Sequence, residues 1–463
     1  MDPRLHARSG PHRLARIAVA FVACVALAGG AAAAAAPPPT PDAWTMYALT
    51  PGHNAYYASD FPAVSWHFTV PGASQARGNA LLDPTVVRDL VGFGVGVALV
   101  AGTVYADNND GWLYALAART GKLRWRFHAF NQLMGTPVVA TVDGRRMVFV
   151  GAGNSVFAYS EAVKFGVGNA RVTRGNGVSA LYALDAATGR KVWAFPTRGE
   201  DMPTPVLVDG RVLFGNGDGH VYALDAATGK LAWKTDIRSF VSMSSATLDR
   251  NAGVVVMGGT HPSRIYGLDA ATGKLLWSVA PPGVFSSSAG DGTWASAGGR
   301  VIGQIETQDA AGAKAGTSAS EELAIDVRSG RIVWSTQLGS GKTPPRNKDA
   351  VPTVVDGVVY TGSPVTHVEY ALDAVTGKVL WQRRLDASMK AAPTVVGDSL
   401  VQPTASGAIV TLDRRTGAVT HTLNLREGGY GPQNAIVVGR TLVIGSNAGV
   451  LQALPLRQLG VEP

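Results

Sequence analysis

The amino-acid sequence predicts an all-β fold, an eight-bladed β-propeller of four-stranded antiparallel blades. Three observations lead to this prediction. A short phrase ending in tryptophan recurs along the chain, as in "LYALDAATGRKVW" (181–193) and "VYALDAATGKLAW" (221–233). The repeat has a basic period of about 40 residues, which is the length of a propeller blade. The two ends of the chain also carry complementary parts of one further unit.

Each unit has the pattern of short strands joined by tight turns. Residues 204–233 alternate apolar and polar side chains in short runs, which are broken at Asp-Gly, Gly-Asp-Gly and Thr-Gly. Such breaks are typical of hairpins between antiparallel strands. Three strands are visible in this way, and the segment around Trp233 supplies a fourth. A four-stranded unit of this length is a propeller blade.

The recurring phrase is interpreted as the structure that joins neighbouring blades. Asp225 can accept backbone N–H bonds at the start of the turn, and Gly229 can adopt the positive φ that closes it. Trp233 fills the wedge between blades, where its ring is buried and its N–H finds a carbonyl. The residues expected to dock the blades are Trp66, Trp125, Asp185, Gly189, Trp193, Asp225, Gly229, Trp233, Asp269, Gly273, Trp277, Asp326, Gly330, Trp334, Asp373, Gly377 and Trp381.

The two ends of the chain are expected to complete one blade together. Residues 441–454 supply inner strands without an outer strand, and residues 61–70 supply an outer strand without inner ones. Joining them in one sheet closes the ring and removes an open edge. The count is then eight blades, with seven as the competing count.

The N-terminus is typical of an export signal. Scattered arginines precede a short apolar run and an Ala-rich stretch with possible A-x-A cleavage sites. We therefore predict a signal peptide over 1–36, a lead-in over 37–60, the propeller over 61–457 and a tail over 458–463. The mature protein would be periplasmic or secreted. Lipidation of Cys24, which would tether the protein to a membrane, is the alternative.

Composition excludes several classes of function. The only cysteine lies within the predicted signal peptide, so the mature chain lacks disulfides, Cys-ligated metal sites and c-type haem attachment. The formal net charge is +8, but the basic residues are scattered and form no Lys/Arg-rich run. This pattern argues against nucleic-acid binding.

The docking motif resembles that of a known superfamily. The pattern Ala183-x-Asp185-x-x-Thr188-Gly189-x-x-x-Trp193 is similar to the motif of PQQ-repeat propellers, and the resemblance spans roughly 44–457. That superfamily contains quinoprotein alcohol dehydrogenases and BamB-type outer-membrane assembly proteins. In its enzymes the resemblance implies PQQ in the central funnel, over Ca²⁺ or a lanthanide held by Glu, Asn and Asp, with a further Asp as base.

The candidate site residues lie where the chain enters each innermost strand, because those positions face the funnel axis. Glu200 and Asp201 offer hard oxygen ligands for a metal. Asp349, beside Lys348 and Lys390, is the candidate catalytic base. The candidate cofactor-binding residues are Glu200, Asp201, Lys348, Lys390 and Asn434. The competing interpretation is that these charged residues are only solvated at the mouth of the funnel. No metal ligand is assigned.

Three insertions are candidates for recognition, because loops on a rigid scaffold commonly carry binding sites. They are residues 156–179, 306–322 and 339–352. The sequence-based prediction is a non-enzymatic periplasmic binding or scaffold protein, without a cofactor, that takes a protein or peptide partner through its funnel and insertion loops. The alternative is a dehydrogenase dependent on PQQ and Ca²⁺ or a lanthanide, acting on alcohols or sugars.

Overall fold

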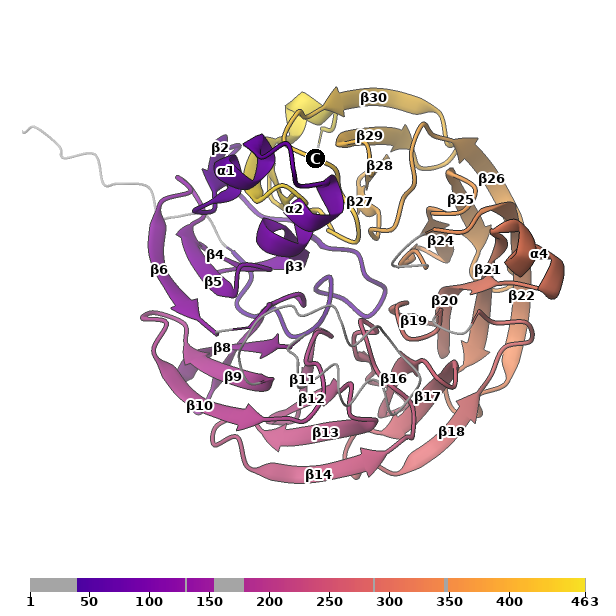
Figure 1. Ribbon diagram of the computed structural model, residues 1–463, viewed down its shortest axis with the longest axis horizontal. Helices are drawn as coiled ribbons and strands as arrows, with labels where there is room; N and C mark the ends of the chain where they lie inside the picture. Colours follow the sequence, from indigo (N-terminus) through magenta and orange to yellow (C-terminus); the bar gives the residue numbers. More distant parts are fainter. Residues whose placement is uncertain (1–39, 130, 154–178, 286–287, 345–348, 463) are drawn as a thin grey trace, which may run out of the picture. The chain divides into compact units, whose positions relative to one another are not determined.

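A computed structural model describes residues 40–129, 131–153, 179–285, 288–344 and 349–462. Within the unit from Pro38 to Pro463, these residues form eight antiparallel sheets arranged as blades around a central axis (Figure 1). The predicted eight-bladed propeller is therefore confirmed, and the seven-bladed alternative is excluded.

Seven of these blades are formed by four strands that follow one another in the chain. Their strands are β3 (Phe93–Val100), β4 (Thr103–Asn108), β5 (Trp112–Ala117) and β6 (Leu123–His128); β7 (Val138–Val142), β8 (Arg145–Ala152), β9 (Ala180–Asp185) and β10 (Lys191–Pro196); β11 (Val206–Val208), β12 (Arg211–Gly215), β13 (His220–Asp225) and β14 (Leu231–Asp236); β15 (Thr247–Asp249), β16 (Val254–Gly259), β17 (Arg264–Asp269) and β18 (Leu275–Val279); β19 (Ala295–Ala297), β20 (Arg300–Thr307), β21 (Thr317–Asp326) and β22 (Ile332–Lys342); β23 (Thr353–Val355), β24 (Val358–Thr361), β25 (Val368–Asp373) and β26 (Val379–Arg384); and β27 (Thr394–Val396), β28 (Ser399–Pro403), β29 (Ala408–Asp413) and β30 (Val419–Asn424).

The eighth blade combines both ends of the described chain. Its strands lie in the order β1 (Tyr56–Tyr57), β31 (Ile436–Val438), β32 (Thr441–Gly445), β33 (Val450–Pro455) and β2 (Trp66–Thr69). Strand β2 pairs antiparallel with β33, with Trp66 opposite Ala453. Figure 1 shows the indigo and yellow ends meeting in this sheet. The predicted closure is confirmed.

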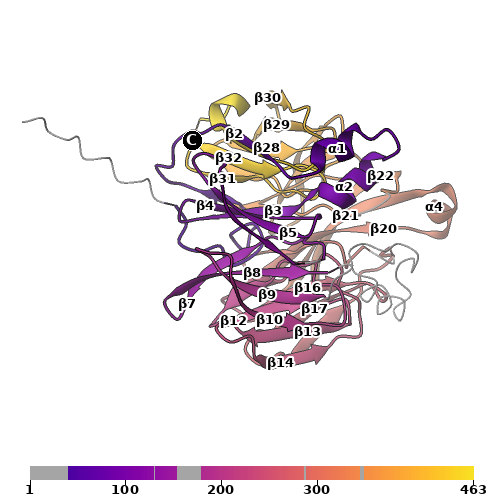
Figure 2. The ribbon, with the colours of Figure 1, turned by 60° about the vertical axis from the view of Figure 1, so that its left-hand side comes forward.

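A few short helices complete the described chain. Helices α1 (Ala73–Gly78) and α2 (Pro84–Val91) link β2 to β3, and the 3₁₀ helix η1 (Leu456–Leu459) follows β33. Helix α4 (Ala310–Ala315) lies between β20 and β21, on a hairpin that projects from the ring (Figure 2). In the described residues, we find no helix long and apolar enough to span a membrane.

The three insertions predicted from sequence differ in where they lie in the structure. Residues 306–322 extend β20 and β21 into the projecting hairpin and include α4, so this segment prolongs the blade. Strand β22 runs as far as Lys342, which places the first residues of 339–352 in the same sheet. Positions 154–178, which hold nearly all of the insertion 156–179, lie outside the described residues, as do 1–39 with the predicted signal peptide and Cys24.

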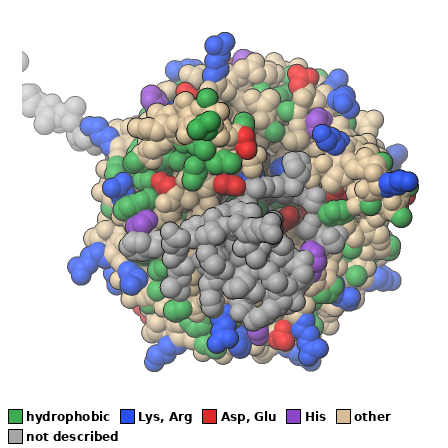
Figure 3. Space-filling model, in the orientation of Figure 1, with side chains coloured by type: hydrophobic (Ala, Val, Ile, Leu, Met, Phe, Trp, Pro, Cys, Tyr) green, Lys and Arg blue, Asp and Glu red, His purple; other side chains and the backbone are tan. Residues whose placement is uncertain are grey.

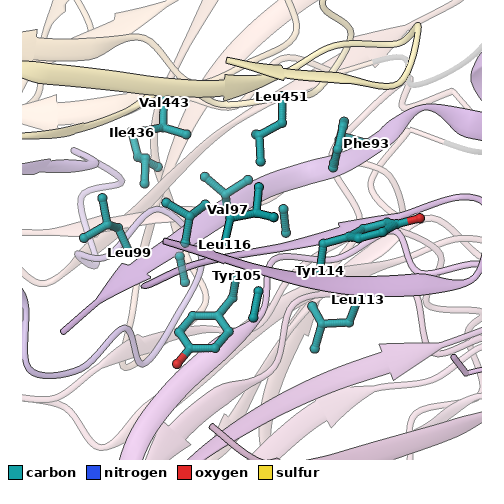
Figure 4. Packing of buried hydrophobic residues seen from close by; sticks show 14 of the residues in the cluster. Phe93, Val97, Leu99, Tyr105, Leu113, Tyr114, Leu116, Ile436, Val443 and Leu451 are labelled. Carbon is teal, nitrogen blue, oxygen red and sulfur yellow. The ribbon is translucent and has the colours of Figure 1, made fainter. Parts of the chain in front are cut away.

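Neighbouring blades are held together by apolar side chains between their sheets. Where the ring closes, Val97 and Leu99 of β3 lie beside Ile436 and Val443 of the eighth blade (Figure 4). All four side chains are buried. Burying an aliphatic side chain of this size stabilises a fold by about 1.5–3 kcal/mol. The junction between the chain ends is therefore packed as a continuous core.

The recurring tryptophans lie between blades. The Trp193 indole donates its N–H to the Ala226 carbonyl of the next blade at 3.0 Å. The same contact is made by Trp66 to Ala118, Trp125 to Ala186, Trp277 to Val327, Trp334 to Ala374 and Trp381 to Arg414. Asp225 accepts hydrogen bonds from the backbone N–H and the hydroxyl of Thr228. These bonds fix the turn that faces the Trp193 indole. Each of these indoles thus contacts the turn of the following blade. Trp233 also packs against such a turn, at Gly273, but its N–H has no hydrogen-bond partner among the described residues, so the carbonyl predicted for it is not found.

Gly229 allows a test of this contact between a turn and the Trp193 ring. Its φ is +71°, and a Cβ there would lie 2.7 Å from the Trp193 ring. Gly210 has the same φ of +71°, but a Cβ there would meet nothing within 4 Å. We expect Gly210→Ala to cost about 1 kcal/mol of backbone strain and Gly229→Ala about 1–3 kcal/mol more, because the ring must move. Urea unfolding of the two variants measures the difference, and equal midpoints would contradict the docking role.

The lead-in runs through the centre of the ring. Trp44 exchanges backbone hydrogen bonds with Val139 of β7, at 2.7 and 2.8 Å. Further on, backbone carbonyls of the segment accept from the innermost strands of four other blades, through Leu207, Ser296, Val354 and Val437. The segment is visible as the violet trace across the middle of Figure 1. It therefore fills part of the axial channel and places Tyr47, which is buried, near the axis.

Charged side chains are dispersed on the face seen in Figure 3. Lys and Arg side chains lie around its rim, and no basic cluster is formed by the described residues on this face. This distribution agrees with the scattered basic residues of the sequence. An extended phosphate backbone would require a continuous basic surface.

Candidate active site

The innermost strands of successive blades are linked where they enter the central funnel. The Thr136 backbone N–H donates to Thr204 Oγ1 at 2.8 Å. The Thr204 N–H donates to Ser245 Oγ, and the Ser245 N–H donates to Thr293 Oγ1, each at 3.1 Å. A hydroxyl side chain at the start of each strand thus satisfies the backbone of its neighbour. This row of contacts links the innermost strands of four consecutive blades, β7, β11, β15 and β19.

A small cavity of about 10 Å³ lies at this level on the axis. It is lined by the lead-in residue Tyr47, by Met243 and by the charged residues Asp291, Asp349 and Lys390. Its volume is about that of one water-sized sphere. The structure therefore brings together Asp349 and Lys390, two of the candidate residues, whereas Lys348 lies outside the described residues.

Asp349 has the environment expected of a functional carboxyl. Its Oδ1 accepts a 2.7 Å hydrogen bond from Ser288 Oγ, and its Oδ2 has no hydrogen-bond partner among the described residues. The side chain is buried. Burial raises the pKa of Asp349 well above its usual range; the Ser288 hydrogen bond lowers it in part, and the charges of Asp291 and Glu306 raise it further. Asp349 therefore keeps its proton at a pH where an ordinary aspartate is ionised.

The other described candidates are used in internal contacts. Asp201 accepts hydrogen bonds on both oxygens, from Thr197 Oγ1 and from Asn216 Nδ2, each at 2.6 Å. The Glu200 carbonyl accepts from the same Asn216 amide at 2.9 Å. Asn434 Oδ1 accepts from the Ala392 N–H at 2.8 Å. These three residues do not line the cavity of Asp349, and the Asp201 oxygens are already engaged within the protein.

Sequence reasoning missed two buried acids in the blades β19–β22 and β23–β26, which lie on either side of Asp349 in the chain. Glu322 on β21 and Glu369 on β25 are fully buried. Burial raises the pKa of Glu322 to about 8, and burial together with the charge of Glu322 raises the pKa of Glu369 well above its usual range. A signal existed in the repeats, since both glutamates occupy the position held by Val221 and Ile265 in other blades. Tyr47 had no comparable signal, because it comes from outside the repeats.

Comparison with known families gives the chain its place. The family model for outer membrane protein assembly factor BamB, a PQQ-repeat family, matches residues 63–164, 160–302 and 319–458. The chain belongs to this PQQ-repeat family. Two curated relatives are named tetrathionate hydrolases. The protein from Acidithiobacillus ferrooxidans is 29% identical over 443 residues, which are 90% of this chain and 87% of the relative. The protein from Acidianus ambivalens is 26% identical over 392 residues, 80% of this chain and 72% of the relative.

Solved structures of PQQ-repeat propellers have the same fold. BamB from Moraxella catarrhalis superimposes with a TM-score of 0.59 at 18% identity, covering 85% of this chain and 99% of that one. A europium-containing methanol dehydrogenase gives a TM-score of 0.59 at 13% identity, covering 88% of this chain and 90% of that one. At these identities the likeness concerns the fold alone.

Two of the sequence-based predictions are corrected by these comparisons. The prediction of a non-enzymatic scaffold is wrong, because relatives matched over most of the chain are enzymes by name. The prediction that the chain takes no cofactor is corrected as well, since enzymes share its repeats and its fold and one of them contains europium. Both errors have one physical cause: the docking motif builds the blades irrespective of what the funnel holds.

The described residues do not form a seat for PQQ with calcium. Among them, no three His, Cys, Asp or Glu side chains lie together as metal ligands. The Asp201 oxygens are already hydrogen-bonded. The chemistry below is therefore derived from Asp349 and its neighbours, without a step through a quinone or a metal.

Proposed function

We propose that this chain is an exported hydrolase that cleaves tetrathionate, with Asp349 as the proton donor in the central funnel. The observation that carries the proposal is the buried Asp349 carboxyl, whose Oδ2 lacks a partner among the described residues beside an axial cavity. The relatives named tetrathionate hydrolases, matched over 80–90% of the chain, support the choice of substrate.

The electrostatics of the site favour a protonated Asp349. Tetrathionate is a dianion, and two ionised carboxylates at Asp291 and Asp349 would repel it. With its raised pKa, Asp349 is neutral in acid, and Lys390 on the same cavity supplies a positive charge for a sulfonate group. The cavity holds about one water as it stands, so tetrathionate would enter after the funnel widens there. Met243 and Tyr47 then add a less polar wall suited to the central sulfur atoms of the substrate.

The proposed reaction is a balanced hydrolysis. The oxygen of one water forms a bond to one central sulfur, and the central S–S bond breaks with its electron pair leaving on the other half. Asp349 Oδ2 gives its proton to that departing sulfur, and one proton of the attacking water returns to Asp349. One tetrathionate dianion and one water thus yield one hydrogen thiosulfate and one hydroxysulfane-sulfonate monoanion. Proton donation from a buried acid avoids building a dianion in a poorly solvated site.

The test uses the mature chain, beginning at residue 37, and tetrathionate. We expect release of thiosulfate in proportion to enzyme, measured by ion chromatography, and no comparable release from heat-denatured protein. A folded preparation that releases no thiosulfate over a range of acidic and neutral pH would overturn the proposal. Dye reduction with methanol after addition of PQQ and Ca²⁺ serves as a parallel assay, since turnover there alone would also contradict it.

Export and partners belong to the same proposal. Cleavage of residues 1–36 would place the enzyme in the periplasm or outside the cell, where its dianionic substrate needs no transport into the cytoplasm. The insertion 156–179 is kept as the segment that would contact a protein partner. Mass spectrometry of the mature N-terminus from an expressing cell distinguishes signal-peptide cleavage from lipidation at Cys24.

A further inference from the structure

The segment that leads from β18 to β19 lies beside both oxygens of the Asp349 carboxyl. Ser288 Oγ lies 2.7 Å from Asp349 Oδ1 and accepts the Glu306 backbone N–H at 2.8 Å. Ser288 is fully buried. Four residues on, a Cβ at Gly292 would lie 3.2 Å from Asp349 Oδ2 and 3.3 Å from the Gln304 carbonyl oxygen. One short segment therefore binds one oxygen of the proposed proton donor and limits the space beside the other.

The contact with Glu306 fixes the direction of the Ser288 hydrogen bond. A backbone N–H can only donate, so Ser288 Oγ acts as the acceptor on that side. Among the described residues, the remaining contact of this hydroxyl is Asp349 Oδ1. A buried hydroxyl hydrogen without an acceptor is unfavourable, so the hydroxyl donates to Oδ1. A proton carried by Asp349 then lies on Oδ2.

Gly292 avoids crowding that second oxygen, which is itself buried. A contact of 3.2 Å from Cβ is tighter than nearly all contacts that a real Cβ makes. Any side chain at this position would press against Oδ2 and against the β20 backbone together. The absence of a side chain leaves room beside Oδ2, at the small cavity that Asp349 lines.

We propose that Ser288 and Gly292 are positioning residues, which hold the Asp349 proton on Oδ2 and keep that buried oxygen uncrowded beside the cavity. This inference rests on the proposed function, because it assigns the geometry of the same proton transfer. It adds that the two oxygens of Asp349 have different roles: Oδ1 anchors the carboxyl and Oδ2 delivers the proton.

The first experiment compares Ser288→Ala and Ser288→Thr with the wild-type chain. Loss of the hydroxyl lets the proton occupy either oxygen, so we expect kcat of Ser288→Ala to fall by about tenfold with KM little changed. The alkaline limb of kcat should move to higher pH, because the lost hydrogen bond favoured the ionised carboxyl. The charges of Asp291 and Glu306 that face Asp349 remain in place in the variant. Ser288→Thr keeps the hydroxyl and should recover most of the rate.

A spectroscopic readout separates this inference from the proposed function. The carboxyl C=O infrared band present in the wild-type chain and missing from Asp349→Asn reports protonation of Asp349 without substrate. Its midpoint should move to higher pH in Ser288→Ala and return in Ser288→Thr. If the midpoint and kcat are both unchanged in Ser288→Ala, the positioning role is wrong. If the wild-type chain shows no tetrathionate turnover but the midpoint moves, the proposed function fails and the coupling of Ser288 to Asp349 stands.

Gly292→Ala tests the second half of the inference. We expect kcat to fall by about tenfold or more, while the infrared band of Asp349 is retained. Gly78→Ala is the matched control, since a Cβ there meets nothing within 4 Å. A Gly292→Ala variant as active as Gly78→Ala would show that access to Oδ2 does not limit the reaction.

Discussion

Asp349→Asn is expected to hydrolyse tetrathionate about 10²- to 10⁴-fold more slowly than the wild-type chain, the usual contribution of a general acid. The amide has the shape of the carboxyl, and its oxygen can still accept the 2.7 Å hydrogen bond from Ser288. The fold should therefore survive, while the proton for the departing sulfur is lost. Initial rates of thiosulfate release at saturating tetrathionate measure the effect on kcat.

The pH dependence of kcat should follow the same carboxyl. Burial raises the pKa of Asp349 well above its usual range. An acid acts in its protonated form, so kcat is full below the folded-state pKa and is lost as pH rises through it. Asp349→Asn should lack this alkaline limb. A wild-type rate that rises with pH through the same range would instead indicate a general base and would contradict the assignment.

Asp249→Asn is the matched control for Asp349→Asn. Asp249 is also a buried aspartate that accepts a serine hydroxyl from the adjacent blade, from Ser296 at 2.8 Å. It lies at the end of β15, and it does not line the cavity of Asp349. If both variants lose activity to the same extent, the effect is structural.

The ring of blades and its closure could be predicted because both depend on short sequence patterns. A tryptophan eight residues after an aspartate marks five of the junctions, and the incomplete units 61–70 and 441–454 required each other. An unpaired sheet edge is unfavourable, so these two units were expected to pair in one sheet. The path of the lead-in was not predictable in this way. Trp44 pairs with Val139, about a hundred positions away, through backbone groups that carry no residue-specific signal.

The candidate site was predictable in position and less so in chemistry. Entry points to the innermost strands do meet at the axis, which is why Asp349 and Lys390 share a cavity. Asp201 shares that kind of position, but Thr197 and Asn216 engage both of its oxygens. The position of a residue in the repeat does not reveal such hydrogen bonds, because these bonds depend on the conformation of the adjacent turn. The activity was missed for a further reason, since repeats that build blades are common to enzymes and scaffolds.

Protein stability should fall steeply as pH rises from about 5 to 8. Glu322 and Glu369 are fully buried on adjacent blades, and the Gln304 amide beside them donates to Thr361 and to the Gly362 carbonyl. Burial raises the pKa of Glu322 to about 8 and that of Glu369 well above its usual range. The folded state therefore keeps protons that the unfolded chain releases near its ordinary Glu pKa. Each such proton lowers the free energy of unfolding by up to about 1.4 kcal/mol per pH unit.

A buried histidine acts in the opposite direction at low pH. His53 of the lead-in contacts the Pro352 carbonyl and the Thr247 hydroxyl, and burial lowers its pKa to about 3. As pH falls from about 6.5 towards 3, His53 is protonated in the unfolded chain but stays neutral in the folded state. The free energy of unfolding therefore decreases over this range. The two buried glutamates and His53 together confine maximal stability to mildly acidic pH.

Glu322→Gln and Glu369→Gln test the glutamate contribution separately from His53. An amide is neutral at every pH, so each variant should flatten the decline between pH 5 and 8, and the double variant should flatten it most. Glu321→Gln is the control, because Glu321 is on the same strand but accepts hydrogen bonds from Ser335 and Gln337 at the exposed surface. Urea unfolding at each pH gives the slope directly. An unchanged slope in the double variant would mean that these carboxyls are already ionised in the folded protein.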